Sequence, residues 1–593
     1  MCLKPASEPP AGNAYLWLVG TLALGVGLPF FCVSASAPLL QTWFARSGHP
    51  QAHDPYFLYA ASNLGSLLAL LSYPFVVEPW SGVAMQSVVW MWAFVVLLGG
   101  MALCATSARA SNADARGAER GLVPAEVPGR WVERLHWTAL AFVPSGLLVA
   151  FSTHITTDVA SAPLLWVLPL AAFLLTFVLV FRERPVLPHG IVLAVQPVLV
   201  ILALGGMAVP GHLTHVIGTF AGAVCFFVTM LVAHRELYLK RPEPGRLTEF
   251  YLWMSFGGVL GGMFAALLAP QIFSRNWEYV LLLTLGMACR PWDVARCRAE
   301  RDLRETVIAF IVVAGSIAVA AFAFGAKWLP ASHGASVMVG SLVVLGALAV
   351  AAWKQPVRQL ACIVAILATV VLLPSRLSSG HSERSFFGVH RVYESADGTY
   401  RLLSHGTTVH GAQRIAETGG RPTPLTYYHP HGPIAFGIEA ARSATVGRSR
   451  EFSVGVVGLG AGSVACYHRA GEKWSFYEID PVVVRMARDP HLFTFLSKCQ
   501  PNARIVLGDA RLTLAHVPAG GFDHLLIDAF SSAGLSEAQA ECVADRALKD
   551  DKILTPLLVN IIFGDPGIGT AIAVAVRAAQ GCVTADDLKR LFP

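Results

Sequence analysis

The chain has 593 residues, of which 54% are hydrophobic and only 14% are charged, and its mean hydropathy is +0.56. Soluble globular proteins carry about 25% charged residues, so this composition excludes an ordinary soluble protein and indicates that many apolar side chains face lipid. The net charge of +6 is modest and spread over loops, so we expect no nucleic-acid partner. The eleven cysteines contain no C-x-x-C pair, and we expect isolated thiols, without a zinc site or a disulfide framework.

Apolar windows long enough to cross a bilayer fill residues 1–376. The first begins at Ala14 and is too long for the apolar region of a cleaved signal peptide, so we expect it to be a membrane span. The windows lie near residues 15–37, 56–77, 83–105, 136–153, 159–181, 190–209, 214–233, 249–271, 305–326, 334–353 and 357–374. With the short apolar stretch 279–289, they predict a multi-pass transmembrane domain of about 11–12 spans.

Two features inside the apolar windows can each be interpreted in two ways. The run Gly257-Gly-Val-Leu-Gly-Gly262 contains two overlapping G-x-x-x-G spacings, which predict close helix packing or a moving helix interface. His154 and Asp158 lie one turn apart near a span end, where they predict either intramembrane chemistry or simply a solvated helix end.

The sequence changes character after Pro374, where a polar linker begins. Residues 387–394 and 399–404 alternate in polarity around Ala396-Asp-Gly398, the pattern of a β-hairpin. From residue 453 onward, strand-like runs at 453–457, 474–479, 503–507 and 523–528 alternate with helix-compatible segments. This rhythm predicts a parallel, doubly wound α/β sheet.

Glycines and acids follow these predicted strands. Gly458, Gly460 and Gly462 come directly after the first strand, where a tight turn and close approach to a ligand both need residues without Cβ. The acids Glu478, Asp509 and Asp528 end the next three strands. Because ligands of doubly wound sheets bind outside the carboxyl ends of strands, we expect one nucleoside pocket, although any single acid could instead cap the following helix.

Four motifs then carry a family resemblance: Gly-x-Gly-x-Gly, Phe476-Tyr-Glu-Ile-Asp480, Leu507-Gly-Asp-Ala510 and Leu526-Ile-Asp-Ala529. They resemble the S-adenosylmethionine-type fold of the spermidine synthase family. Upstream, Ser404–Gln413 and Pro424–His429 resemble that family's β-hairpin domain and tyrosine-containing gating segment. Ala37-Pro-Leu-Leu-Gln41 and residues 54–66 resemble bacterial fusions of a transporter-like membrane domain to such a synthase.

The resemblance implies binding and catalytic roles for individual residues. Gly458, Gly460 and Gly462 would contact the aminoacyl or aminopropyl arm of the nucleoside, Glu478 its ribose and Asp509 its adenine amino group. Asp528 would be the catalytic base, and Gln413, Tyr428 and His429 would line the substrate entrance. The donor in this set would be decarboxylated S-adenosylmethionine. The co-substrate would be this donor or S-adenosylmethionine itself, with no metal. A carboxylate suits the reaction, because the attacking amine must lose its proton although alkylammonium pKa values lie near about 10.

One departure concerns the acceptor. Asp528-Ala-Phe-Ser-Ser532 runs into Ala533-Gly-Leu, where the family has a second acid that holds the diamine. Residues 533–593 are atypical for the family, so diamine specificity is the implied property most affected.

The sequence thus predicts an α-helical polytopic membrane domain (1–376), a β-hairpin and gating segment (377–452) and a Rossmann-like domain (453–593). The function expected is a membrane-bound aminopropyltransferase acting on a polyamine or related amine. The alternatives are a methyltransferase using S-adenosylmethionine, or a transporter with a ligand-sensing or weakened synthase-like domain. The expected partners are the lipid bilayer and a small amine, and a homo-oligomer is compatible with the sequence.

Two arguments conflict on which side of the membrane the C-terminal domain lies. The loops Arg109–Arg134 and Arg290–Arg304 carry five arginines each, and the positive-inside rule places both in the cytoplasm. If residues 279–289 also cross, alternation puts the C-terminal domain on the far side. Because its expected ligand is a cytosolic metabolite, we expect instead a bacterial inner-membrane protein whose C-terminal domain is cytoplasmic.

Overall fold

The computed structural model describes most of the chain, with gaps. The described residues are 17, 20–47, 49–115, 130–159, 165–209, 212–291, 334–352, 355–372, 380–395, 397–406, 408–417, 420–445, 447, 450–518 and 520–528. The chain divides into two compact units, and each is treated by itself. A helical unit comprises Met1–His154, Ala162–Ala269 and Trp277–Ser378, and a sheet unit comprises Ile155–Ser161, Pro270–Asn276 and Ser379–Pro593.

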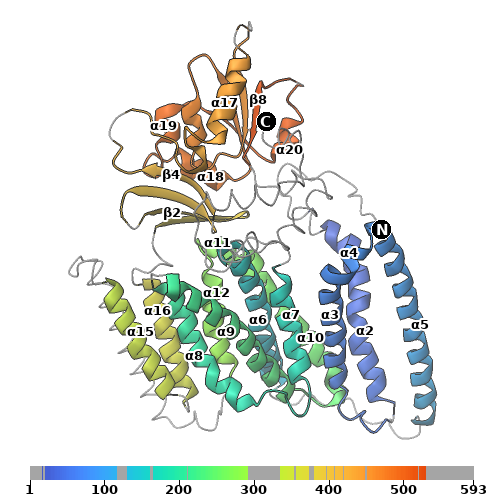
Figure 1. The fold of residues 1–593 in the computed structure, drawn as a ribbon. Coiled ribbons are helices and arrows are strands. Elements are labelled where there is room, and N and C mark those ends of the chain that lie inside the picture. The colour runs from blue at the N-terminus through green and yellow to red at the C-terminus, as the bar shows by residue number, and fades with distance from the viewer. Residues whose placement is uncertain are drawn as a thin grey trace. The chain divides into compact units, whose positions relative to one another are not determined.

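In the described part of the helical unit the secondary structure is helical (Figure 1), and α11 lies at its boundary with the sheet unit. They are α2 (Leu28–Ala45), α3 (Phe57–Ser72), α4 (Glu78–Trp80), α5 (Val83–Ala115), α6 (Arg130–His154), α7 (Val167–Val180), α8 (His189–Ala208), α9 (His212–Leu239), α10 (Leu247–Met263), α11 (Ala269–Ile272), α12 (Trp277–Leu285), α15 (Gly334–Ala351) and α16 (Pro356–Leu372). Short π-helical segments at Tyr73–Val77, Ile155–Val159 and Phe264–Leu268 extend α3, α6 and α10.

Six stretches of helix are long and apolar enough to cross a membrane: Phe57–Trp80, Val83–Ala108, Trp131–Thr157, His189–Ala208, Leu213–Leu239 and Pro244–Ile272. The bent pair Gly20–Gly27 and Phe30–Ala45 makes a seventh if it is one span. Shorter apolar helices occupy Val167–Val180, Trp277–Cys289, Met338–Ala351 and Arg358–Val371. The expectation of a mostly helical, multi-pass membrane region is confirmed, and the predicted span at 305–326 lies outside the described residues.

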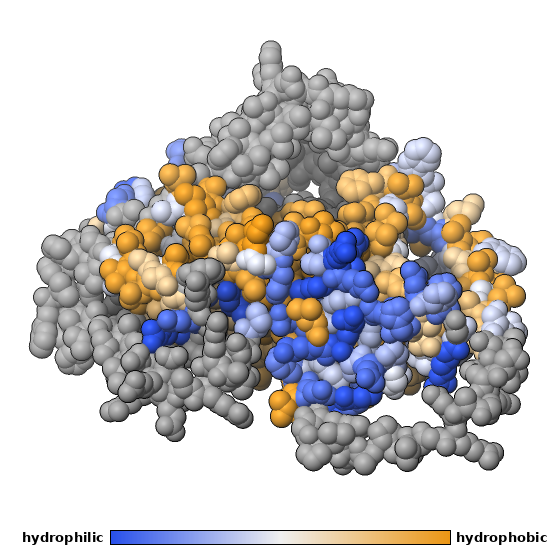
Figure 2. Space-filling model, turned by 90° about the horizontal axis from the view of Figure 1, so that it is seen from below, coloured by the Kyte–Doolittle hydropathy of each residue, from blue (hydrophilic) through white to orange (hydrophobic). Residues whose placement is uncertain are grey.

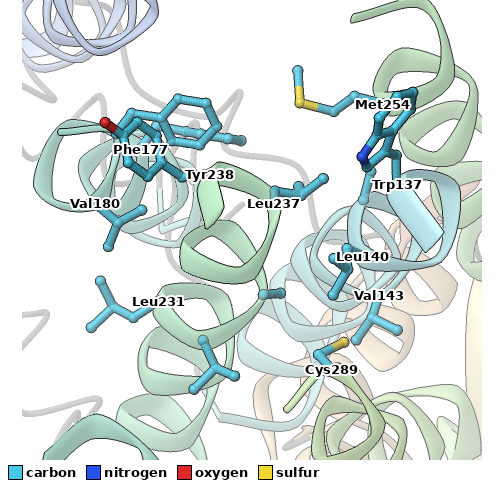
Figure 3. Close-up of a cluster of buried hydrophobic side chains, with 14 of the residues drawn as sticks. Trp137, Leu140, Val143, Phe177, Val180, Leu231, Leu237, Tyr238, Met254 and Cys289 are labelled. Atoms are coloured by element: carbon cyan, nitrogen blue, oxygen red, sulfur yellow. The ribbon is translucent and has the colours of Figure 1, made fainter. Parts of the chain in front are cut away.

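The core of the helical unit joins several of these helices (Figure 3). Trp137 of α6 is fully buried and lies near Met254 of α10, while Phe177 of α7 lies beside Tyr238 of α9. Large apolar and aromatic side chains therefore fill the space between α6, α7, α9 and α10, whereas the opposite faces of the helices expose apolar residues to the surroundings. This is the distribution expected of helices in lipid.

The glycine pattern in α10 forms a packing seam with α6. A Cβ placed on Gly257 would lie 2.2 Å from the carbonyl oxygen of Thr138, and one on Gly261 would lie 2.1 Å from that of Phe142. The two helices run in the same direction, since residues 138 and 142 meet residues 257 and 261 in that order. The predicted close packing is confirmed, because no larger side chain fits at these two positions.

His154, at the end of α6, is 8% exposed and stacks on Tyr279 of α12, with ring centroids 4.8 Å apart. The interpretation of His154 as part of a solvated helix end is therefore wrong. The side chain of Asp158 lies outside the described residues.

The described residues of the sheet unit form two four-stranded sheets. The first is an antiparallel meander of β1 (His381–Ser385), β2 (Gly388–Glu394), β3 (Tyr400–His405) and β4 (Thr408–Arg414) in that order. The second is parallel, with the order β7-β6-β5-β8, and consists of β5 (Ser453–Val457), β6 (Lys473–Glu478), β7 (Arg504–Leu507) and β8 (His524–Ile527). Its helices are α17 (Pro433–Ala444), α18 (Pro481–Arg488), α19 (Phe495–Cys499) and α20 (Ala510–Leu514).

The cysteines correct one expectation. Cys466 and Cys499 form a disulfide with their Cα atoms 4.8 Å apart, so the prediction of isolated thiols is wrong for this pair. Packing between the turn after β5 and α19 brings them together across a sequence separation of 33 residues. Among the described residues, unpaired cysteines are Cys32, Cys104, Cys225, Cys289 and Cys362.

Candidate functional site

The glycine turn after β5 has a backbone that only glycine adopts readily. Gly458, Gly460 and Gly462 have φ angles of +96°, +53° and +83°. A Cβ on Gly458 would lie 2.6 Å from the carbonyl oxygen of Asp528, and one on Gly460 would lie 2.9 Å from that of His410. Conformation and space both require glycine here, and the turn lies against the residue after β8 and the first half of β4.

Glu478 ends β6 and supports the same turn. Its side chain is buried, with Oε2 accepting a hydrogen bond from the Leu459 amide at 2.9 Å and Oε1 accepting one from the Asp480 amide at 2.9 Å. A carboxylate has about four lone-pair positions, so each oxygen keeps capacity for a further donor. The structure therefore gives Glu478 a part in holding the turn, which the sequence did not predict.

Asp528 follows β8 and meets a tyrosine from the segment before α17. Pairing of β8 with β5 fixes its position, since its amide donates to the carbonyl oxygen of Val457 at 2.8 Å. The hydroxyl of Tyr428 donates to Oδ2 of Asp528. Tyr428 is 1% exposed, and its hydroxyl lies 3.0 Å from that of Tyr427. Two tyrosines and a carboxylate from distant parts of the sequence thus form one hydrogen-bonded group beside the glycine turn.

Local backbone geometry holds this tyrosine pair. Thr426 has a φ of +62°, the one positive φ among the described non-glycine residues, at the start of the 3-10 turn Thr426–Tyr428. Tyr467 donates its hydroxyl to the carbonyl oxygen of Tyr428 at 2.5 Å. A non-glycine residue in this region is strained, and such strain persists where surrounding contacts fix the conformation.

Burial sets the protonation of the group. Desolvation, together with the charge of Glu478, raises the pKa of Asp528 to about 6, and the hydrogen bond from Tyr428 opposes that rise. Burial, followed by the charge of Asp528, raises the pKa of Tyr427 to about 12 and raises that of Tyr428 well above its ordinary value. At neutral pH the tyrosines are therefore neutral donors, and Asp528 can accept and release a proton.

Asp509, by contrast, lies at the far edge of the parallel sheet, after β7. It caps α20, accepting from the Arg511 amide at 2.9 Å, and forms an exposed ion pair with the Arg511 side chain at 2.7 Å. These hydrogen bonds, with that from the Arg511 side chain first, lower the pKa of Asp509. Its observed role is the helix cap that the sequence left open as an alternative.

Gln413 and His429 make their hydrogen bonds elsewhere. The Gln413 amide oxygen accepts from the Thr494 amide at 2.9 Å, and its nitrogen donates to the Thr494 hydroxyl at 2.5 Å. His429 is exposed, and its Nδ1 accepts from the amide of His431. The structure therefore brings Gly458, Gly460, Glu478, Asp528 and Tyr428 together, but it does not show Gln413 or His429 joining them.

The sequence did not identify Asp480 as a residue that joins the two sheets. Asp480 caps α18 through the Val482 amide at 2.8 Å and also accepts from His390 of β2 at 2.8 Å and from the Ser385 hydroxyl of β1 at 2.5 Å. An acid directly before Pro481 is a helix N-terminus signal that predicts the cap, but nothing local predicts its partners in the meander.

No group of three His, Cys, Asp or Glu side chains within the described ranges is arranged to hold a metal ion. Comparison with protein-family models, with curated proteins and with solved structures finds no match for this chain.

Proposed function

We propose that the sheet unit binds a sulfonium nucleoside and transfers its aminopropyl group to an amine. The order β7-β6-β5-β8, numbered along the chain as 3-2-1-4, is that of the first four strands of a Rossmann-like sheet. In such sheets ligands bind at the carboxyl ends of the strands, where the glycine turn, Glu478 and Asp528 lie. These features support an S-adenosylmethionine-type fold preceded by a small antiparallel β domain.

The observation that carries the proposal is the pairing of half-buried Asp528 with fully buried Tyr428 beside the glycine turn. In the proposed reaction the amine nitrogen attacks the carbon beside the sulfonium sulfur. The new C–N bond forms as the C–S bond breaks, the thioether nucleoside leaves, and the proton of the amine passes to Asp528. A carboxyl group with a pKa near 6 is suited to take that proton near neutral pH.

The charge of the site favours the decarboxylated donor over S-adenosylmethionine. The charge of Glu478 acts on Asp528, so the proposed site holds two interacting carboxylates. A decarboxylated donor carries only positive charges, whereas S-adenosylmethionine adds a carboxylate that two nearby acids would repel. A methyltransferase is therefore the weaker candidate.

Asp509 would contact adenine only by exchanging its ion pair with Arg511. That pair is exposed, and exposed ion pairs contribute little to stability because solvent screens them, so a ligand could displace it. The adenine role of Asp509, like the substrate roles of Gln413 and His429, stays a prediction.

The test uses the purified full chain in detergent, with calorimetry for both donors and mass spectrometry of turnover with a panel of amines. We expect tighter binding of the decarboxylated donor and aminopropyl transfer to an amine. Asp528→Asn should lower turnover about 10²- to 10⁴-fold while donor binding persists. Glu451→Gln, an exposed acid paired with Lys473 on the same sheet, is the matched control and should keep full activity.

Other outcomes would decide against the proposal in different ways. Methyl transfer would favour the methyltransferase. Donor binding without turnover, combined with solute uptake by proteoliposomes, would favour a transporter with a sensing domain. Full activity of Asp528→Asn would remove the proposed base.

A further inference from the structure

One end of the helical unit can be defined from contacts between helices. Trp137, near the start of α6, donates to the carbonyl oxygen of Lys240, just after α9. Tyr56, just before α3, donates to the carbonyl oxygen of Pro242. Arg235, near the end of α9, donates to the carbonyl oxygen of Val180, the last residue of α7. The starts of α3 and α6 and the ends of α7 and α9 therefore lie together, and we call this the basic end.

Helix α12 runs toward the basic end. Tyr279, near its start, lies against Gly222 of α9, and Gly286, just after it, lies against Thr229 of the same helix. The two helices are thus parallel, and Arg290 reaches the carbonyl oxygen of Leu193 in the first half of α8. The short apolar stretch 279–289 therefore runs toward the basic end, opposite in direction to α10, as expected if successive spans alternate across the membrane.

The last two helices return the chain to the opposite end. In α15, Leu342 and Gly346 lie against Gly205 and Ile201 of α8, in reverse order, so α15 runs antiparallel to α8 and toward the basic end. The Gln359 side chain of α16 then donates to the carbonyl oxygen of Ala349, which joins the two helices as an antiparallel pair. Helix α16 consequently starts at the basic end and finishes, at Leu372, at the other.

Positive charge is concentrated at the basic end. Among the described residues, the lysines and arginines there are Arg46, Arg134, Arg182, Arg184, Arg235, Lys240, Arg241, Arg246, Arg290 and Arg358. The described connections at the opposite end, near 73–83, 155–159, 205–213 and 270–277, contain Arg275 alone. Figure 2 shows hydrophilic residues gathered at the centre of the face seen from below. By the positive-inside rule the basic end faces the cytoplasm.

The cysteines give an independent indication. Both described cysteines of the sheet unit, Cys466 and Cys499, are joined in a disulfide, while all of the described unpaired cysteines belong to the helical unit. Disulfides form and persist outside the cytoplasm and are rare within it.

We propose that the sheet unit lies on the non-cytoplasmic side of the membrane. The chain leaves the helical unit at the end of α16, opposite the basic end, and the segment 373–380 that leads to β1 is too short to cross a bilayer again. This placement replaces the expected cytoplasmic one and does not depend on the proposed chemistry. Its consequence rests on the proposed function: the acceptor amine comes from the outer compartment, and the nucleoside donor must be supplied across the membrane.

Reporter fusions to the full chain in a bacterial host test the placement. Alkaline phosphatase is active only where its disulfides form, outside the cytoplasm, and green fluorescent protein exported in unfolded form stays dark. At the C-terminus we expect active phosphatase and no fluorescence. Inserted between Arg184 and Pro185, with the rest of the chain following, the same reporters should give the opposite pattern. Fluorescence and inactive phosphatase at the C-terminus would overturn the proposal.

A second measurement follows the disulfide in the same cells. Chain denatured without reductant should bind two fewer maleimide-polyethylene glycol molecules than reduced chain, and the double variant Cys466→Ser, Cys499→Ser should lose this difference. An unchanged count after reduction of the wild-type chain would contradict the outer location. Donor binding by detergent-solubilised protein does not depend on orientation, so failure of the placement and failure of the proposed function are distinguishable.

Discussion

Replacing Tyr428 by phenylalanine keeps the packing of the ring and removes its hydroxyl, which bonds to the half-buried carboxylate of Asp528 and lies 3.0 Å from the hydroxyl of Tyr427. The hydroxyl donates to Asp528, and this bond lowers the pKa of that carboxyl against the stronger effect of burial. A hydrogen bond to a charged group contributes about 1.5–3 kcal/mol, and about 1.4 kcal/mol corresponds to one pKa unit. Tyr428→Phe should therefore raise the pKa of Asp528 from about 6 to about 7 or 8.

The sign of the effect on rate follows from the role of Asp528 as a base. Only the ionised carboxylate accepts the proton, so activity falls as pH drops through its pKa. In the variant, the acidic limb of the profile of kcat against pH should move upward by the same amount, with little change above about pH 9, where Asp528 is ionised in both proteins. Turnover at pH 6 to 9, measured by mass spectrometry, reports this shift.

Tyr393→Phe is the matched control, since Tyr393 lies on β2 opposite Leu402 and makes no hydrogen bond to the described residues of the site. Its profile should coincide with that of the wild-type protein. An acidic limb that stays in place in Tyr428→Phe, or a uniform loss of rate at every pH, would refute the assignment of the base and leave Tyr428 a purely structural role.

Three further changes test the turn, the disulfide and the helix seam. Gly458→Ala should weaken donor binding and lower the free energy of unfolding by about 1–3 kcal/mol, because the φ of Gly458 is +96° and the new Cβ would meet Asp528. Gly471→Ala, at a φ of +86° in open space, is the control that carries the conformational cost alone. Calorimetry and thermal unfolding compare the two variants. The double variant Cys466→Ser, Cys499→Ser should lose about 4 kcal/mol by the chain-entropy model, and its melting temperature should no longer respond to reductant, as that of the wild-type chain does. Gly261→Val should abolish monodisperse protein in size-exclusion chromatography, while valine at the next residue, which faces open space, should be tolerated; equal behaviour of the two would contradict the seam.

Parts of the site were predictable because their signals are local. The glycines at 458 and 460 form a turn with positive φ angles, and the residue type predicts this because glycine adopts positive φ more readily than other residues. Acids at strand ends were predictable for the same reason, since an alternating or apolar run shows where a strand stops. Their functions were not, because a carboxylate at a strand end can support a turn, cap a helix or face a ligand. Glu478 and Asp509 show two of these outcomes.

The sequence by itself determined the apolar, mostly helical character of the first part of the chain, the strand-rich region that follows it and the glycine turn, since each depends on neighbouring residues and on apolar length. Only the tertiary structure decided which distant groups meet. Tyr428 and Asp528 are separated by 100 residues, and Cys466 and Cys499 by 33, and no local pattern encodes such pairs. Helix direction belongs to the same class: an apolar run shows that a segment can cross, whereas its contacts with neighbouring helices show which way it runs and on which side the chain emerges.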